Sequence, residues 1–258
     1  LGYVALSEKP ALRCREIIPA KIDPEMELNE EQSAAFKGLY DQLIAPQPGA
    51  ALLHGVTGSG KTAVYIRLIQ ACLEREKQAI LLVPEIALTP QLLGLMAAWF
   101  GPNVAVLHSS LPATERYDQW KRVRSGEAAV VVGTRSAVFA PCEAPGLIIL
   151  DEEQEHSYKS ENSPRYDARE VAIWRGAKEN ALVLLGSATP SVESMFYAKS
   201  GIYTLYTLRE RFGGRKRASI LADAVESVIA ACFLDGGMEA AKAFITKFVL
   251  CDVPVMRL

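Results

Sequence analysis

Short apolar runs alternate with stretches of helical length through most of the 258-residue chain. The runs, rich in Val, Ile and Leu, lie at residues 51–53, 79–83, 104–107, 129–132, 147–150 and 182–185. Amphipathic stretches such as 62–76 and 90–100 separate most of them. Strands that alternate with helices predict right-handed crossovers and a parallel sheet covered on both faces. We therefore expect an α/β fold with functional residues just after the strands, at their carboxyl ends.

Two helix starts are marked by capping signals. Asn29 followed by Gln32 forms a capping-box pattern, and residues 46–49 (Pro-Gln-Pro-Gly) are expected to end that first helix. Thr89 directly before Pro90 predicts the start of another helix, because proline is favoured at the first helical position.

Residues 55–62 read Gly-Val-Thr-Gly-Ser-Gly-Lys-Thr and fit the pattern G-x-x-x-x-G-K-[ST]. They follow an apolar run and open a helical stretch, which is the context that a phosphate-binding loop requires. Lys61 is expected to reach the β- and γ-phosphates, and the Thr62 hydroxyl to bind Mg²⁺. The predicted nucleotide-binding residues of the loop are Gly55, Thr57, Gly58, Ser59, Gly60, Lys61 and Thr62.

Two carboxylates follow the apolar run 146–150. Asp151 at the strand end is placed to hold Mg²⁺, and Glu152 beside it can orient and deprotonate an attacking water. Taken alone, such a pair is more often the start of a solvated loop. Together with the phosphate-binding loop it predicts a nucleoside triphosphatase with Lys61 and Glu152 as catalytic residues.

The composition excludes several other classes of protein. With 50% hydrophobic and 22% charged residues, the chain can bury a core and is not an intrinsically disordered sequence. No apolar run approaches the ~18 residues of a membrane span. Five scattered cysteines without a C-x-x-C pair suit reduced thiols in a cytoplasmic protein. The net charge of −2 means that any nucleic acid must be bound through local patches.

Six blocks of the sequence resemble the first motor lobe of PriA-like replication-restart helicases of superfamily 2, from about residue 28 to residue 208. The blocks are residues 56–62, 82–91, 107–109, 133–137, 151–153 and 186–191. The run Leu-Val-Pro-Glu-Ile-Ala-Leu-Thr-Pro at 82–90 is specific to PriA-like proteins. The resemblance implies a RecA-like ATP-binding lobe of a DNA helicase that uses Mg²⁺. It also implies action on forked or single-stranded DNA together with primosome proteins.

The resemblance also assigns roles by position. The blocks that line the DNA strand in such motors contain Pro84, Glu85, Thr134 and Arg135. The block that couples hydrolysis to movement contains Ser187 and Thr189, which from the residues alone could equally be helix caps. Gln32 resembles a helicase residue that reads the adenine edge, whereas unaided it predicts only a helix cap.

Two features depart from the family pattern. Gln154 stands where PriA-like proteins usually carry His, and because Gln can still hydrogen-bond across the nucleotide cleft we expect hydrolysis to survive. A second motor lobe with its arginine finger has no counterpart in the 258 residues, so we expect an incomplete helicase. A nucleotide-binding module without efficient turnover is the resulting alternative.

The chain changes character after residue 208. Residues 209–218 are basic and are expected to be a solvated linker or, alternatively, a phosphate contact. Beyond them we expect a small helical segment with two helices, 218–234 and 238–250, joined by Asp235-Gly236-Gly237. The expected domains are a leader at 1–27, the motor lobe at 28–208, the linker at 209–218 and the helical segment at 219–258.

The helical segment resembles the later part of a ribonuclease III nuclease domain. In that family the positions of Asp223 and Glu226 are Mg²⁺ ligands that cut double-stranded RNA, and carboxylates at i and i+3 share one helix face. The earlier signature helix of the family has no match here. The chain is therefore expected to be a chimera, and its tail either part of a nuclease, possibly rebuilt in a dimer, or a helix pair without function.

Overall fold

The computed structural model describes Cys14 and residues 17–22, 27–161, 163–211, 228–229, 235–240 and 242–245. The chain divides into two compact units, Leu1–Phe212 and Gly213–Leu258. In the described part of the chain, no helix is both long and apolar enough to span a membrane.

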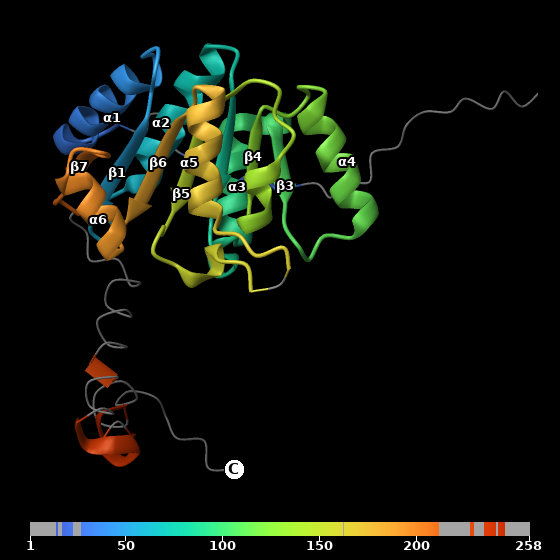
Figure 1. The fold of residues 1–258 in the computed structure, drawn as a ribbon. Helices are drawn as coiled ribbons and strands as arrows, with labels where there is room; N and C mark the ends of the chain where they lie inside the picture. Colours follow the sequence, from blue (N-terminus) through green and yellow to red (C-terminus); the bar gives the residue numbers. More distant parts are fainter. Residues whose placement is uncertain are drawn as a thin grey trace, which may run out of the picture. The chain divides into compact units, whose positions relative to one another are not determined.

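The first unit is an alternation of strands and helices (Figure 1). The strands are β1 Ala50–Gly55, β2 Gln78–Leu82, β3 Val104–Leu107, β4 Val130–Gly133, β5 Pro145–Asp151, β6 Leu182–Ser187 and β7 Thr204–Leu208. The α-helices are α1 Glu30–Leu43, α2 Lys61–Glu74, α3 Pro90–Phe100, α4 Ala113–Arg124, α5 Ala168–Glu179 and α6 Val192–Lys199. Short 3₁₀ turns are η1 Glu85–Ala87, η2 Gly101–Asn103, η3 Arg135–Phe139 and η4 His156–Tyr158.

The strands form one sheet in the order β3-β4-β2-β5-β6-β1-β7, and every neighbouring pair is parallel. This confirms the predicted α/β class. Because all strands run the same way, their carboxyl ends meet at one edge of the sheet. That edge holds the phosphate-binding loop after β1 and the two carboxylates at the end of β5.

Helices cover both faces of the sheet (Figure 1). One face packs against α1, α2 and α3, and the other packs against α4, α5 and α6. Successive residues of a strand serve opposite faces: Leu81 belongs to the first core cluster, and Ile80 and Leu82 belong to the second. A strand that is buried on both faces must be apolar throughout, which explains the unbroken apolar runs.

The predicted helix starts are confirmed. The Gln32 amide N–H donates to Asn29 Oδ1 at 2.8 Å, and the Asn29 amide N–H donates to Gln32 Oε1 at 3.0 Å, which completes the capping box of α1. Thr89 Oγ1 accepts a hydrogen bond of 3.3 Å from the Leu92 amide at the start of α3. These caps fix where the two helices begin.

The edge strand β7 was not predicted. It pairs in parallel with β1, and of its five residues only Leu208 is fully buried. A strand with so few apolar positions facing the core leaves no apolar run to recognise. Directly after it, the amides of Arg209 and Glu210 both donate to Glu31 Oε2, at 2.6 and 2.9 Å. The first residues of the expected linker are therefore held against α1.

The described part of the expected leader packs against α3. The Ala20 amide donates to the Gly94 carbonyl of α3 at 2.9 Å. A Cβ atom at Gly94 would lie only 2.9 Å from the Ile18 carbonyl oxygen, so glycine permits this close approach.

In the second unit, residues 228–229, 235–240 and 242–245 are described, and they are helical. The prediction of a connecting turn at Asp235–Gly237 is therefore wrong. Gly237 keeps the positive φ of a turn glycine, +70°, and is nevertheless included in the helical pattern. The proposed metal ligands Asp223 and Glu226 lie outside the described residues.

Candidate nucleotide-binding and hydrolytic site

The phosphate-binding loop lies between β1 and α2, as predicted. Gly58 and Gly60 both have a φ of +78°, a left-handed conformation that favours glycine. A Cβ atom at Gly55 would lie 2.5 Å from Ser59 Oγ, so the start of the loop also requires a small residue. The glycines of the motif therefore follow from the tight path of the backbone.

Lys61, at the start of α2, reaches across the loop. Its Nζ donates to the Gly55 carbonyl at 3.1 Å and lies 3.2 Å from Glu152 Oε1. The Lys61 side chain is largely buried, whereas that of Glu152 is one-third exposed (33%). The ion pair brings together the two motifs that the sequence predicted separately.

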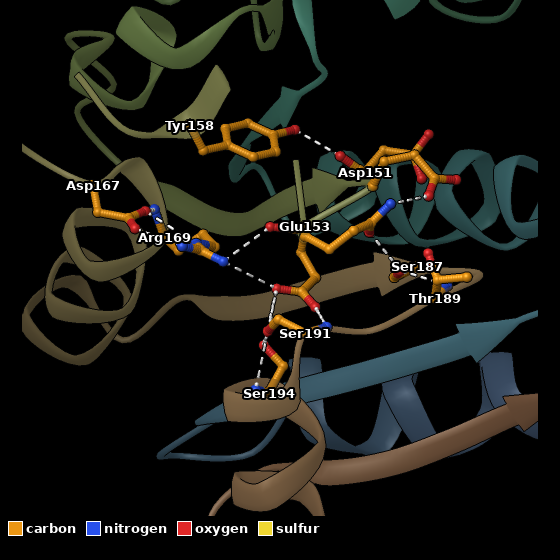
Figure 2. Close-up of polar contacts among 11 residues, drawn as sticks. Asp151, Glu153, Tyr158, Asp167, Arg169, Ser187, Thr189, Ser191 and Ser194 are labelled. Atoms are coloured by element: carbon orange, nitrogen blue, oxygen red, sulfur yellow. Dashed lines mark hydrogen bonds and ion pairs between the residues drawn. The ribbon is translucent and has the colours of Figure 1, made fainter. Parts of the chain in front are cut away.

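Asp151 is held by two tyrosines that the sequence analysis did not select. Tyr65 Oη donates to Asp151 Oδ1 at 2.9 Å. Tyr158 Oη donates to the Asp151 carbonyl at 2.6 Å (Figure 2). Burial raises the pKa of Asp151, although the Tyr65 hydroxyl opposes this by stabilising the charged form. Tyr65 lies four residues after Lys61 on α2, a spacing that places both on one helix face.

Gln154 joins the acidic pair to the end of β6. Its Nε2 donates to Glu152 Oε2 at 3.0 Å, and its Oε1 accepts from Ser187 Oγ at 2.5 Å. Ser187 Oγ in turn accepts from the Thr189 amide at 2.9 Å. Lys61, Glu152, Gln154, Ser187 and Thr189 thus form one continuous chain of polar contacts.

Glu153 is a further residue that the sequence analysis did not select. It is fully buried, and its carboxylate accepts hydrogen bonds from Ser191 and Ser194 at the start of α6 (Figure 2). A third successive acid after an apolar strand was the available signal, and its burial was not foreseeable without the position of α6.

Gln32 is also fully buried, and its side chain has two roles. Besides capping α1, its Nε2 donates to the Ser59 carbonyl of the phosphate-binding loop at 2.8 Å. The helix-cap interpretation is therefore confirmed. The structure adds a tie between α1 and the loop, and the adenine contact stays a prediction.

The loop carries an unsatisfied polar atom. Among the described residues, Ser59 Oγ is buried without a hydrogen-bond partner, which costs free energy unless a ligand supplies one. The Thr62 hydroxyl and the Asp151 carboxylate are hard oxygen donors of the kind that Mg²⁺ prefers. Together with Lys61 and the loop amides, these residues fit a nucleotide phosphate and its Mg²⁺.

The residues predicted to line DNA follow the carboxyl ends of β2 and β4. Pro84 and Thr134 are buried, and Glu85 is exposed and accepts from Ser109 Oγ at 3.4 Å. Arg135 Nη1 donates to the carbonyls of Ser157 and Lys159, at 3.1 and 2.6 Å. The guanidinium thus already orders the segment after β5, a role that the sequence analysis did not foresee.

This fold and this site define a P-loop nucleoside triphosphatase lobe. A family model described as DEAD/DEAH box helicase matches residues 29–196, and the chain belongs to that family. A second family model, described as Ribonuclease-III-like, matches residues 199–253. That second match begins before β7 and therefore includes a strand of the first unit's sheet.

Among curated proteins, the chain is similar to the replication restart protein PriA of Bacillus subtilis (strain 168), with 48% identity over 195 residues. That alignment covers 76% of this chain and 24% of the relative. The PriA of Chlamydia pneumoniae is 40% identical over 222 residues, which cover 85% of this chain and 30% of the relative. The chain thus spans less than a third of the length of these relatives.

Solved structures show the same fold. The structure of RecG bound to a three-way DNA junction matches with a TM-score of 0.57 and 24% identity, over 85% of this chain and 31% of that one. The Hef helicase domain of Pyrococcus furiosus matches with a TM-score of 0.53 and 17% identity, over 86% of this chain and 53% of that one. The first unit is a RecA-like helicase lobe.

Proposed function

We propose that the chain is the ATP-binding motor lobe of a PriA-like DNA helicase that acts in replication restart. The observation that carries this is the 3.2 Å ion pair between Lys61 and Glu152, since it places the phosphate-binding loop and the acidic strand end in one site. Identity of 48% to a replication restart protein supports the assignment of that site to this class of helicase.

Each residue then has a chemical task. The loop amides and Lys61 hold the triphosphate, and Thr62 and Asp151 hold Mg²⁺, which when bound neutralises phosphate charge. When the Lys61 ammonium binds the triphosphate, its ion pair with Glu152 breaks. The Glu152 carboxylate is then free to accept a proton from water.

The proposed substrate strand is DNA, forked or single-stranded, along the loops after β2 and β4. Glu85 and Arg135 lie there at the carboxyl edge of the sheet, on the same edge as the phosphate-binding loop. Primosome proteins are the proposed partners. Gln154 would couple the two ends of the site, because it bonds both Glu152 and Ser187.

The test measures ATP binding and hydrolysis by the full chain, with and without forked DNA, for wild type and Lys61→Ala. We expect Lys61→Ala to weaken ATP binding about tenfold or more, because it removes a charge-assisted contact to phosphate. Lys178→Ala is the matched control, since Lys178 is an exposed lysine in the last turn of α5.

The outcomes separate the alternatives. No Lys61-dependent binding of ATP would overturn the proposal. Binding without DNA-stimulated hydrolysis would instead identify a nucleotide-binding module without efficient turnover. Equal loss in Lys178→Ala would mean that the Lys61 effect is not specific to the loop.

A second candidate function rests on the Ribonuclease-III-like match at residues 199–253. We propose metal-dependent cleavage of double-stranded RNA, with Asp223 and Glu226 as the ligands, as the activity to test there. Cleavage by the full chain that requires Mg²⁺ and is abolished by Asp223→Ala would support it. Absence of cleavage in wild type would dismiss it.

A further inference from the structure

Glu153 is a carboxylate that the proposed hydrolytic chemistry does not use, yet it is fully buried and has several polar partners. Its Oε1 accepts from the Ser191 amide at 2.7 Å, and its Oε2 accepts from Ser194 Oγ at 2.9 Å and Ser191 Oγ at 3.2 Å (Figure 2). Arg169 Nη1 lies 3.6 Å from the same Oε2. Burial of a carboxylate costs desolvation free energy, which is offset only where its partners are well placed. The number of partners here therefore indicates a specific geometry.

The main chain of Glu153 is held as firmly as its side chain. The Glu153 amide donates to the Gly186 carbonyl of β6 at 3.0 Å, and the Glu153 carbonyl accepts from Arg169 Nη1 at 3.3 Å. Arg169 is itself fixed by Asp167, whose Oδ2 lies 2.7 Å from Nη2. Elements α5, β6 and α6 therefore converge on this one residue.

The neighbouring residue, Glu152, has an unusual backbone. Its φ is +47°, a left-handed conformation that a non-glycine residue keeps only where the surroundings enforce it. This conformation directs the Glu152 carboxylate to Lys61, 3.2 Å away. The next residue, Glu153, makes the contacts to β6, α5 and α6 described above.

We propose that Glu153 is the positioning residue of the site: it clamps the turn after β5 so that Glu152 faces the phosphate-binding loop. This rests on the proposed function, since Glu152 matters only if the site hydrolyses a nucleotide. The competing role is that Glu153 merely caps α6. Ser191 already provides that cap, because its Oγ accepts from the Ser194 amide at 3.2 Å.

Hydrogen exchange on the nucleotide-free full chain tests the clamp without any need for activity. Two amides report on the turn: that of residue 153 donates to the Gly186 carbonyl, and that of Glu155 donates to the Glu152 carbonyl. In Glu153→Ala we expect both amides to exchange about tenfold faster or more. The Ala63 amide in α2 should be unchanged. If only the Ser191 amide exchanges faster, Glu153 is a helix cap and the proposal is overturned.

Glu153→Gln keeps the size of the side chain and removes its charge, so it tests the clamp if Glu153→Ala fails to fold. Its matched control is Glu179→Gln, which also removes a carboxylate paired with an arginine of α5, Arg175, at 2.8 Å. We expect faster exchange at Glu155 in Glu153→Gln and not in Glu179→Gln. Unchanged exchange at Glu155 in both variants contradicts the proposal.

Measurements of kcat and of ATP binding then test whether the position of Glu152, set by Glu153, matters for hydrolysis. We expect Glu153→Gln to lower kcat about 100-fold, the effect of a displaced reactive group, while ATP binding changes less than about threefold. In a Glu152→Gln background the same change should have no further effect on kcat, because the positioned group is gone. Additive losses would overturn the positioning role. A wild-type chain that binds no ATP would overturn the proposed function instead, and the exchange result would still stand.

Discussion

At the scale of the residue, the site depends on close packing between a glycine and a tyrosine. A Cβ atom added at Gly186, on β6, would collide with the Tyr65 hydroxyl, and Tyr65 is the residue that bonds the Asp151 carboxylate. Gly186 therefore shapes the proposed Mg²⁺-binding end of the site through its packing against Tyr65. Its role could not be predicted from the sequence, because the tyrosine that it accommodates lies 121 positions away, from 65 to 186.

We expect Gly186→Ala to lower the free energy of unfolding by about 1–3 kcal/mol, as overpacking in a rigid core does. It should also displace the Tyr65 hydroxyl from Asp151. Chemical denaturation measures the loss. Removal of the colliding oxygen in Tyr65→Phe should reduce the cost of Gly186→Ala, and fully additive effects of the two changes would contradict this explanation.

Asp167 and Arg169 provide a prediction on pH. Burial alone would raise the pKa of Asp167, but hydrogen bonds from Arg169 outweigh it and hold the pKa below the ordinary 3.8. A carboxyl with a lowered folded-state pKa stabilises the fold above its unfolded pKa, and this stabilisation is lost as the pH falls through the folded value.

Denaturation at a series of pH values from 6 to 2 tests this. Below an unfolded-state pKa of about 3.9, wild type should lose stability more steeply than Asp167→Asn, which has no charge to lose. Parallel curves for the two proteins would show that the pair contributes nothing to the pH dependence.

At the scale of the element, Gln32 links α1 to the phosphate-binding loop through a hydrogen bond to the Ser59 carbonyl. Asn29 and Gln32 share the capping box, but only Gln32 also bonds the Ser59 carbonyl. The two residues therefore offer a matched pair of substitutions.

Both Asn29→Ala and Gln32→Ala should destabilise the chain by about 1 kcal/mol through loss of the cap. Only Gln32→Ala should also weaken ATP binding, because it releases the loop. Thermal denaturation and nucleotide titration of both variants measure the two effects. Equal weakening of ATP binding in the two variants would mean that the cap alone orders the loop.

Comparison of the elements shows which parts of the fold and the site could be predicted from the sequence. The capping box of α1 and the apolar run at 104–107 are local signals, and the structure confirms both. The edge strand β7 has no such run, since four of its five residues are not fully buried. Tyr65 could have been selected by its helical spacing from Lys61. Glu153 could not, because its partners come from α5 and α6.

At the scale of the whole molecule, the boundary of the motor lobe lies after β7. The lobe ends at Phe212 as a compact unit, although the Ribonuclease-III-like match begins at residue 199. Leu208 is only 1% exposed and belongs to the core cluster beneath α1 and α2. The structure therefore assigns residues 199–208 to the helicase lobe.

Two truncated chains test this boundary. A chain that ends at Arg211 should keep its thermal stability and its ATP binding. A chain that ends at Tyr203 loses β7 and should lose about 3 kcal/mol or more, roughly 6–12 °C in Tm. Differential scanning calorimetry compares the two, and equal Tm values would show that β7 does not support the sheet.

The strand order has one more consequence. Along the carboxyl edge, the strand ends follow the order β4, β2, β5, β6, β1. The proposed DNA residues after β4, Thr134 and Arg135, are therefore four strand positions from the phosphate-binding loop after β1. With strands about 4.8 Å apart, four steps separate β4 from β1 by about 19 Å. DNA bound at the loop after β4, as proposed, would therefore be too far away to contact a nucleotide phosphate bound at the loop after β1. Asp151 and Ser187 lie in the middle of this row, at the ends of β5 and β6. We therefore expect the proposed coupling between DNA and nucleotide to pass through these two strand ends.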